Sequence, residues 1–304
     1  MARRPPAKSR TPARRAPTAD QFLRRRLAEQ WAVVARCERP ARAGSVAALH
    51  DLRVALRRMR SLAATFRKLD EDFLERLDER AAKVCDRMGD ARDLDVWLEL
   101  FRGLARAGGA DEVSPRERRL VVALLRRQRT RMAADALDCG MFRRVKKMLR
   151  ARLRRRWPKR DRPAPPPEAF AAKRMLAVRE LIAERRGRAG NFSKGPAHDL
   201  RRAGRRMRYL AEFFAPRLGR ECVRAGHWIT KAQAALGKVH DCDSALELSR
   251  DLPSGRARAA VRRGLRKRRA AQLRKFKAAW RRYADPRLQK AWRAKLEAAA
   301  ARKR

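Results

Sequence analysis

An eleven-residue block occurs twice in this chain, and the repetition constrains the fold more than any other feature of the sequence. "HDLRVALRRMR" begins at His50, and "HDLRRAGRRMR" begins at His198, 148 residues later. At the same offset, without a gap, Phe66 meets Phe214 and "MGDARDLD" meets "LGKVHDCD". Abundant Ala and Arg would align by chance, but His, Phe, Gly and paired Asp would not do so in one register. We therefore predict two structural copies of one unit.

The spacing of apolar residues predicts helices throughout. Apolar residues recur three and four positions apart, and alternating β-branched runs are missing from the sequence. In the first copy the pattern predicts helices over 20–38, 46–69, 71–88, 91–107, 115–138 and 141–156. Short connections between amphipathic helices favour antiparallel packing. The predicted fold is all-α, with two duplicated antiparallel helical bundles related by a pseudo-twofold axis around a shared basic cavity.

Local signals indicate where helices begin and end. Ser45 is a predicted N-cap, and Ser193 or Gly195 is its counterpart in the second copy. Gly89 and Gly237 are expected to end one helix before the next begins. These positions, like the repeated block, are related by the 148-residue offset.

A proline-rich segment divides the two copies. Residues 158–167 cannot be helical throughout and indicate a stiff extended linker. The first helical bundle is therefore predicted over 20–157 and the second over 168–297. Residues 1–19 and 298–304 are basic and lack apolar periodicity, so we expect them to be disordered tails.

The charge of the chain predicts a polyanionic partner. There are 82 Lys and Arg residues against 33 Asp and Glu, a formal net charge of +49, which repels itself in a compact state. The five cysteines are odd in number and form no CxxC pair, which argues against disulfides and structural zinc. No run approaches the ~18 apolar residues of a membrane span, and the N-terminus lacks the apolar core of a signal peptide. We expect a cytoplasmic protein with no membrane contact and no cofactor.

Each repeated block, wound as a helix, places basic side chains on one face and apolar side chains on the other. The basic faces are His50, Arg53, Arg57 and Arg60 in the first copy, and His198, Arg201, Arg205 and Arg208 in the second. Like charges at these spacings destabilise a helix by a few tenths of a kcal/mol per pair. Arg also grips phosphate through two N–H donors. A bound row of phosphates therefore explains these faces better than solvation does, whereas Arg152–Arg156 and Arg262–Arg269 are interpreted as ordinary solvated surface.

The two blocks, each followed at the same distance by "GDARDLDV" or "GKVHDCDS", resemble the CHAD domain family, named for conserved histidines in an α-helical domain. The resemblance covers about Asp20 to Leu296. It implies two helical repeats around a basic cavity that binds inorganic polyphosphate without turning it over, and a protein that docks on polyphosphate granules. The residues that it assigns to polyphosphate are His50, Arg53, Arg57, Arg58, Arg60, Lys83, His198, Arg201, Arg205, Arg206, Arg208 and Lys231.

Four aspartates need a separate explanation, because carboxylates should not touch a polyanion. They are Asp93, Asp95, Asp241 and Asp243. One interpretation is that they orient Arg side chains from behind, leaving other donors free for phosphate. The other is that they cap helices, since Asp favours the first turn. The sequence leaves both open.

Three alternative functions were weighed against polyphosphate binding. A strongly basic protein also binds nucleic acid at low salt through counterion release, and this is the alternative function, although no DNA- or RNA-reading module is present. The second copy contains four residues of metal-ligand types, His227, His240, Asp241 and Asp243. In the first copy the residue that corresponds to His240 is Arg92, so no metal site is predicted. No residue set for acid–base chemistry on phosphorus is evident, so we predict that the protein is not an enzyme.

Overall fold

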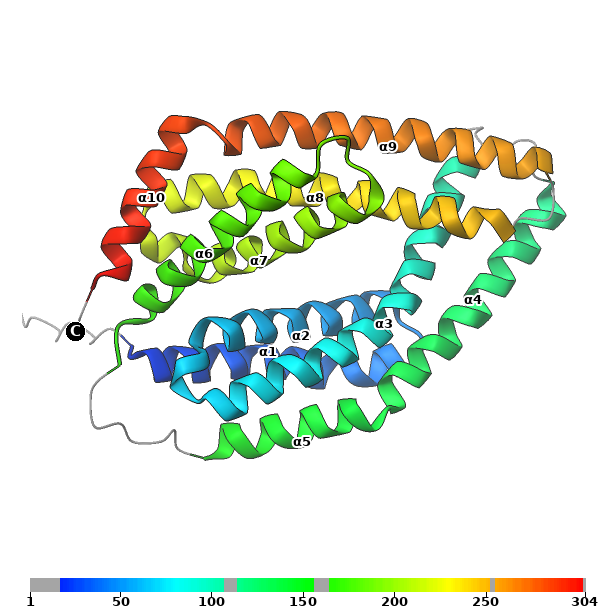
Figure 1. The fold of residues 1–304 in the computed structure, drawn as a ribbon. Coiled ribbons are helices and arrows are strands. Elements are labelled where there is room, and N and C mark those ends of the chain that lie inside the picture. Colours follow the sequence, from blue (N-terminus) through cyan, green and yellow to red (C-terminus); the bar gives the residue numbers. More distant parts are fainter. Residues whose placement is uncertain (1–16, 107–113, 156–163, 252–254, 303–304) are drawn as a thin grey trace, which may run out of the picture.

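In the part of the chain that the structure describes, two groups of five helices follow one another (Figure 1). The structure is a computed structural model that describes residues 17–106, 114–155, 164–251 and 255–302. The first group comprises α1 (Ala19–Arg42), α2 (Val46–Phe66), α3 (Glu71–Arg106), α4 (Pro115–Asp138) and α5 (Gly140–Arg154). The second comprises α6 (Pro167–Arg188), α7 (Lys194–Leu218), α8 (Arg220–Leu248), α9 (Gly255–Tyr283) and α10 (Pro286–Ala300). Short 3-10 turns follow α2 (Arg67–Leu69) and α8 (Ser249–Asp251). The all-α fold class is confirmed for these ranges.

The ends of the helices agree with the sequence pattern in some places and differ in others. The Ser45 hydroxyl accepts a hydrogen bond from the Ala48 N–H at 3.2 Å, which confirms the predicted N-cap of α2. The helix end predicted at Gly89 is wrong, because α3 continues through it to Arg106, and α8 continues through Gly237 in the same way. At the C-terminus α10 is helical through Ala300, which lies inside the predicted tail.

Some of the predicted segments lie largely outside the described residues. These are the N-terminal tail over 1–19, of which residues 17–19 are described, and the linker over 158–167, of which residues 164–167 are described. Among the described helices, none is both long and apolar enough to cross a membrane.

The two groups of helices pack within themselves and also against each other. α3 contacts α8 and α9, and α2 contacts α6 and α7. Figure 1 shows α3 leaving the lower group of helices and rising to α8 and α9 at the right, while α1, α2, α6 and α7 approach one another at the left. The halves are therefore joined at two separate places.

The first junction is a cluster of four phenylalanines. Phe22 lies 5.0 Å from Phe214 and 5.9 Å from Phe66 between ring centroids. Phe66 also lies 5.4 Å from Phe170 and 6.0 Å from Phe214. The 148-residue offset relates Phe22 to Phe170 and Phe66 to Phe214. Phe66 thus packs against its own counterpart Phe214, and the contact of Phe22 with Phe214 is matched by that of Phe170 with Phe66.

The second junction is a smaller apolar cluster where α3 meets α8 and α9, at the right of Figure 1. Trp97, Leu100 and Phe101 of α3 pack with Ala245 of α8 and with Val261 and Leu265 of α9. Burying an aromatic or leucine side chain contributes about 1.5–3 kcal/mol. The two clusters therefore supply the attraction that holds the basic halves together.

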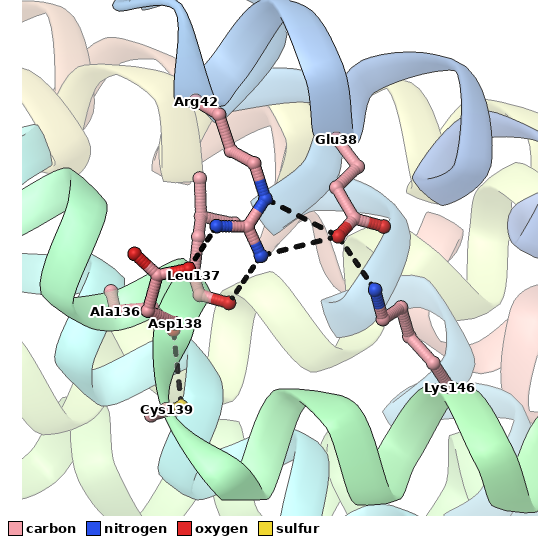
Figure 2. Close-up of polar contacts among 7 residues, drawn as sticks. All are labelled: Glu38, Arg42, Ala136, Leu137, Asp138, Cys139 and Lys146. Atoms are coloured by element: carbon pink, nitrogen blue, oxygen red, sulfur yellow. Dashed lines mark hydrogen bonds and ion pairs between the residues drawn. The ribbon is translucent and has the colours of Figure 1, made fainter.

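Several cations in the first half are engaged in structure rather than available to a ligand. Figure 2 shows Arg42 at the end of α1, which donates to Glu38 and to the Leu137 carbonyl oxygen and pairs with Asp138. The ammonium of Lys146 on α5 donates to the same Glu38 carboxylate at 2.6 Å. These contacts tie α1 to the junction between α4 and α5.

We predict that Phe22 and Phe214 are energetically coupled across the two halves. In a double-mutant cycle with Phe22→Leu and Phe214→Leu, the coupling energy should be about 0.5–1.5 kcal/mol, as for other aromatic pairs. Denaturant unfolding measures it. Phe142→Leu on α5 with Phe276→Leu on α9, helices on opposite sides of Figure 1, should be additive. Additive effects of Phe22 and Phe214 would show that the halves are not joined there.

Candidate functional site

α2 and α7 bring the two basic faces together around one cavity. The cavity has a volume of about 110 Å³ and lies between the halves. Its arginines are Arg57 and Arg60 of α2, Arg174 of α6, and Arg202, Arg205 and Arg206 of α7. Ser61, Ala64, Asp78, Tyr209 and Leu210 complete the lining. Six guanidinium groups thus face the cavity with one carboxylate.

Five of these six arginines have no anionic partner. Among the described residues, only Arg60 forms an ion pair with a carboxylate, that of Asp78, whereas Arg57, Arg174, Arg202, Arg205 and Arg206 form none. The pKa of Arg205 is lowered to about 8. Burial is the main cause, and repulsion by Arg57 and Arg201 adds to it. Because Arg keeps its proton in proteins, the lowered pKa reflects a charge that is buried first and repelled by its neighbours second, and a bound anion would offset both effects. The pKa of Arg206 is lowered as well, first by burial and then by Arg174.

Arg53 and Arg201 lie deeper, against α3 and α8. The Arg53 side chain donates from Nε to the Cys85 carbonyl oxygen at 3.3 Å. Burial and the charge of Arg57 lower its pKa to about 10. Burial also lowers the pKa of Arg201, whose buried Nε has no hydrogen-bond partner within the described structure. The Arg201 side chain thus has a buried donor without an acceptor, whereas Nε of Arg53 has one.

Gly89 has a packing role instead of the predicted role at a helix end. A Cβ built on Gly89 would lie 3.2 Å from the terminal Nη2 of Arg53, which is tighter than ordinary contact. At the equivalent Gly237, a Cβ would lie 3.8 Å from Nε of Arg201, an ordinary van der Waals distance. Glycine in the middle of α3 therefore admits the Arg53 side chain, at a cost of roughly 1 kcal/mol in helix propensity.

Asp93 and Asp241 lie beside these two arginines. Burial raises the pKa of Asp93, although Arg53 and Arg201 act in the opposite direction. Burial raises the pKa of Asp241 to about 6, again against the attraction of Arg201. Both lie in the interior of long helices, so the helix-capping interpretation is wrong for them. Their position fits the orientation of Arg53 and Arg201.

Asp95 and Asp243 act on different arginines. Arg129 of α4 donates to Asp95 at 2.9 Å and to the Gly44 carbonyl oxygen at 2.9 Å. In the second half, Arg269 of α9 donates to Asp243 at 2.6 Å and to the carbonyl oxygen of Phe192 at 2.7 Å.

The 148-residue offset relates Gly44 to Phe192 as well as Asp95 to Asp243, and both carbonyl-bearing residues have a positive φ, at 93° and 56°. Arg129 and Arg269 thus hold the turns that start α2 and α7. Asp95 and Asp243 are not at helix ends, so the helix-capping interpretation is wrong for them too. The arginines that they orient, Arg129 and Arg269, are not among the predicted polyphosphate ligands.

The histidines lie at the N-terminal ends of the two basic faces. Burial lowers the pKa of His50, and Arg92 lowers it further. In the second half the His198 ring stacks on His240, with centroids 5.0 Å apart and an interplanar angle of 26°. Burial and Arg201 lower the pKa of His198, and the pKa of His240 is lowered to about 3. His240 therefore takes the place of Arg92 as a neutral ring.

Three of the predicted ligands are ion-paired. Arg58 of α2 donates from two nitrogens to Glu212 of α7, at 3.1 and 2.9 Å. Arg208 lies 3.4 Å from the other oxygen of that carboxylate. Arg60 donates to Asp78 at 2.6 Å. Glu212 therefore bridges the halves and neutralises two predicted ligands, Arg58 and Arg208, that are not among the residues lining the cavity.

The two predicted lysine ligands lie away from the cavity. Lys83 is exposed on α3, two positions before the buried Cys85 that faces α2, so the two side chains leave the helix about 200° apart. Lys231 on α8 is likewise two positions before Gln233, which packs near Gly204 of α7. Lys231 lines a separate groove. The structure does not bring either lysine to the guanidinium groups.

Sequence reasoning missed several residues that the structure places at the site. Arg202 lies in the second repeated block, but Val54 is its counterpart in the first, so the repeat concealed it. Arg174 and Asp78 lie outside the repeated blocks and carry no local signal. Arg269 belongs to a run that was interpreted as solvated surface, and that interpretation is wrong for Arg269, as it is for Arg152, which pairs with Asp70 at 2.8 Å.

Comparison with known proteins identifies the family. The CHAD domain family model matches residues 25–250, which is most of the chain. The chain belongs to the CHAD domain family. Among solved structures, the CHAD domain from the plant Ricinus communis is 24% identical, with a TM-score of 0.61, and the match covers 93% of this chain and 94% of that one. PptA from Streptomyces chartreusis is 22% identical, with a TM-score of 0.58, over 91% of this chain and 99% of that one.

At these identities the two structures show that this CHAD chain shares their fold. A comparison with curated proteins found no match. Within the described part of the chain, no group of three or more His, Cys, Asp or Glu residues is arranged to hold a metal ion. The arginine cavity is thus the feature of this CHAD domain that most clearly demands a ligand.

His240 should make the protein less stable in acid. Its pKa falls from 6.5 in the unfolded chain to about 3 in the folded one, so between these values the unfolded state binds more protons. The free energy of unfolding should therefore decrease as the pH falls from 6.5 toward 3. His240→Gln should remove part of that slope in urea unfolding, measured across the pH range.

His227→Gln is the matched control, because His227 is exposed on the same helix. It should leave the slope as in the wild type. If the two variants give the same slope, His240 is not held neutral by its surroundings.

Proposed function

We propose that this CHAD domain binds inorganic polyphosphate in the cavity between α2 and α7 and does not hydrolyse it. The observation that carries the proposal is the convergence of six arginines on a cavity with one carboxylate. Each guanidinium offers paired N–H donors to phosphate oxygens, and each phosphate relieves repulsion between neighbours. We propose that the same contacts dock the protein on polyphosphate granules in the cytoplasm.

The arrangement of the rows also supports a pseudo-twofold relation between two duplicated bundles. Arg57 and Arg205 are related by the 148-residue offset and repel each other, and Phe66 contacts its counterpart Phe214. The contacts of Arg129 with Asp95 and Gly44 recur at Arg269. We propose that α2 and α7 run side by side about this axis, so that a linear polymer meets equivalent donors on both sides.

Polyphosphate fits the cavity better than nucleic acid does. A single phosphate chain can enter a space of about 110 Å³, whereas a DNA duplex cannot. Single-stranded nucleic acid is usually held by aromatic stacking, and the one aromatic residue among the lining residues, Tyr209, is buried. Nucleic acid should bind only to the outer basic surface, through counterion release.

Replacing Arg57 and Arg205 with Ala should weaken polyphosphate binding at least about tenfold at near-physiological salt, because hydrogen bonds to charged groups contribute about 1.5–3 kcal/mol each. Isothermal titration measures the change. The same double variant should unfold at an equal or higher temperature, since it removes unpaired like charges from the cavity.

The matched control removes the same charge from exposed positions, with Arg154→Ala and Arg268→Ala. This variant should bind polyphosphate within about twofold of the wild type, since exposed charges contribute little at this salt. Long polyphosphate should displace duplex DNA in competition. Equal losses from the two double variants would leave only diffuse attraction between a basic protein and any polyanion.

Polyphosphate should survive incubation with the protein. The cavity offers donors for phosphate oxygens but no positioned base or metal-ligand set for attack at phosphorus among the lining residues. Chain length on urea gels and released phosphate should be unchanged with Mg²⁺ or Mn²⁺ present. Shortened chains that persist in the Arg57→Ala, Arg205→Ala variant would instead indicate a contaminating enzyme, and shortened chains lost in that variant would refute the binding-only proposal.

A further inference from the structure

A groove between α8 and α9 combines an apolar floor with a basic rim. Its volume is about 480 Å³. Ala234 and Ala235 of α8 and Ala278 and Ala279 of α9 form the floor, with Gln272 buried beside them and Trp228 at one end. The rim carries Lys231, Lys238, Lys275 and Arg282, and no carboxylate is among the described lining residues.

The residues of the groove repeat along both helices in the same way. On α8 the order is Trp228, Lys231, Ala234 with Ala235, then Lys238, and on α9 it is Gln272, Lys275, Ala278 with Ala279, then Arg282. Each series spans about three turns, or roughly 15 Å. Small residues in the centre of such a pair leave space for the side chains of a third helix.

The residues that form the groove in the second half are not repeated in the first. The 148-residue offset places Asp86 and Arg87 where Ala234 and Ala235 lie, so the equivalent face of α3 carries charges of both signs in place of the apolar floor. The equivalent of Trp228 is Arg80, which contacts Met148 of α5. A helix of the chain thus covers this end of the face in the first half.

We propose that the α8–α9 groove docks an amphipathic, acidic helix of a partner protein. Its apolar side chains would pack on the alanines and Trp228, and carboxylates on both flanks would pair with the four rim cations, as in other helix-in-groove complexes. The proposal is independent of polyphosphate binding. It also assigns a role to Lys231, which lines this groove and does not line the arginine cavity.

The chemistry of the groove favours such a helix over a second polyphosphate. A mineral polyanion gains nothing from an apolar floor, whereas apolar side chains gain about 25 cal/mol for each Å² buried there. Three of the four rim cations are lysines, although arginine is much the commoner residue in this chain. Lysine presents a mobile point charge, which suits carboxylates on a helix, and lacks the fork that grips phosphate.

The probe is a synthetic peptide of about 18 residues, long enough to be helical, with leucines along one face and glutamates on both flanks. A scrambled peptide of the same composition is the reference. At near-physiological salt, fluorescence anisotropy should show the amphipathic peptide binding at least about tenfold more tightly than the scrambled one, because the charges are equal and only the arrangement differs.

Two groove variants test the two halves of the argument. Ala234→Gln with Ala278→Gln fills the floor without changing charge, and both positions are exposed. Lys231→Gln, Lys238→Gln and Lys275→Gln together remove three rim charges. Each variant should reduce the preference for the amphipathic peptide to within about twofold, because each removes one component of the docking surface.

The control removes three charges from exposed positions elsewhere on α9, with Arg274→Gln, Lys277→Gln and Arg281→Gln. This variant should keep the preference for the amphipathic peptide. The Arg57→Ala, Arg205→Ala variant should keep it too, so the experiment can distinguish a failure of helix docking from a failure of polyphosphate binding. Equal binding of the two peptides to the wild type, or an equal loss in the α9 control, would overturn the docking proposal.

Discussion

Repulsion between two facing rows of arginine is the constraint on which the rest of this structure depends. α2 and α7 place Arg57 opposite Arg205 without a carboxylate between them. Such an arrangement persists only if other contacts hold the helices in place. The phenylalanine cluster does so at one end of the halves, and the packing of Trp97 and Phe101 against α8 and α9 does so at the other. These apolar contacts thus keep the two rows of arginines facing each other across the cavity.

The carboxylates near the site divide into groups with different consequences. Asp78 neutralises Arg60 at the cavity, and Glu212 neutralises Arg58 outside its lining. Asp95 and Asp243 lie farther back, where they bind arginines that hold the turns before α2 and α7. Within the described residues, five arginines that pair with no carboxylate converge on the cavity, namely Arg57, Arg174, Arg202, Arg205 and Arg206. The formal charge of +49 is therefore less informative about function than the position of each pair.

The sequence predicted the helices and the two basic faces well, because both depend on local spacing. The bounds of α2, α4 and α5 differ from the predicted ones by at most three residues. Ion-pair partners could not be predicted in this way. Glu212 binds Arg58 from the other half of the chain, and its counterpart at the 148-residue offset is Ala64, so neither local pattern nor repetition indicated the pair.

Gly89 shows a different limit of sequence reasoning. A glycine between two amphipathic stretches is a common helix end, and only the position of the Arg53 side chain reveals why it lies within α3. Lys83 and Lys231 show the converse, because their match in the repeat was real but their side chains leave the helix on the face away from the cavity.

Departures from the repeat determine where an anion would be held most strongly. Arg60 on α2 is neutralised by Asp78, whose counterpart at the 148-residue offset is Gly226. On α7, Glu212 neutralises Arg208, but Arg202, Arg205 and Arg206 all line the cavity. More of the unneutralised charge therefore lies on α7 than on α2. A phosphate chain in this cavity would lie closer to α7, although the duplication supplies donors on both sides.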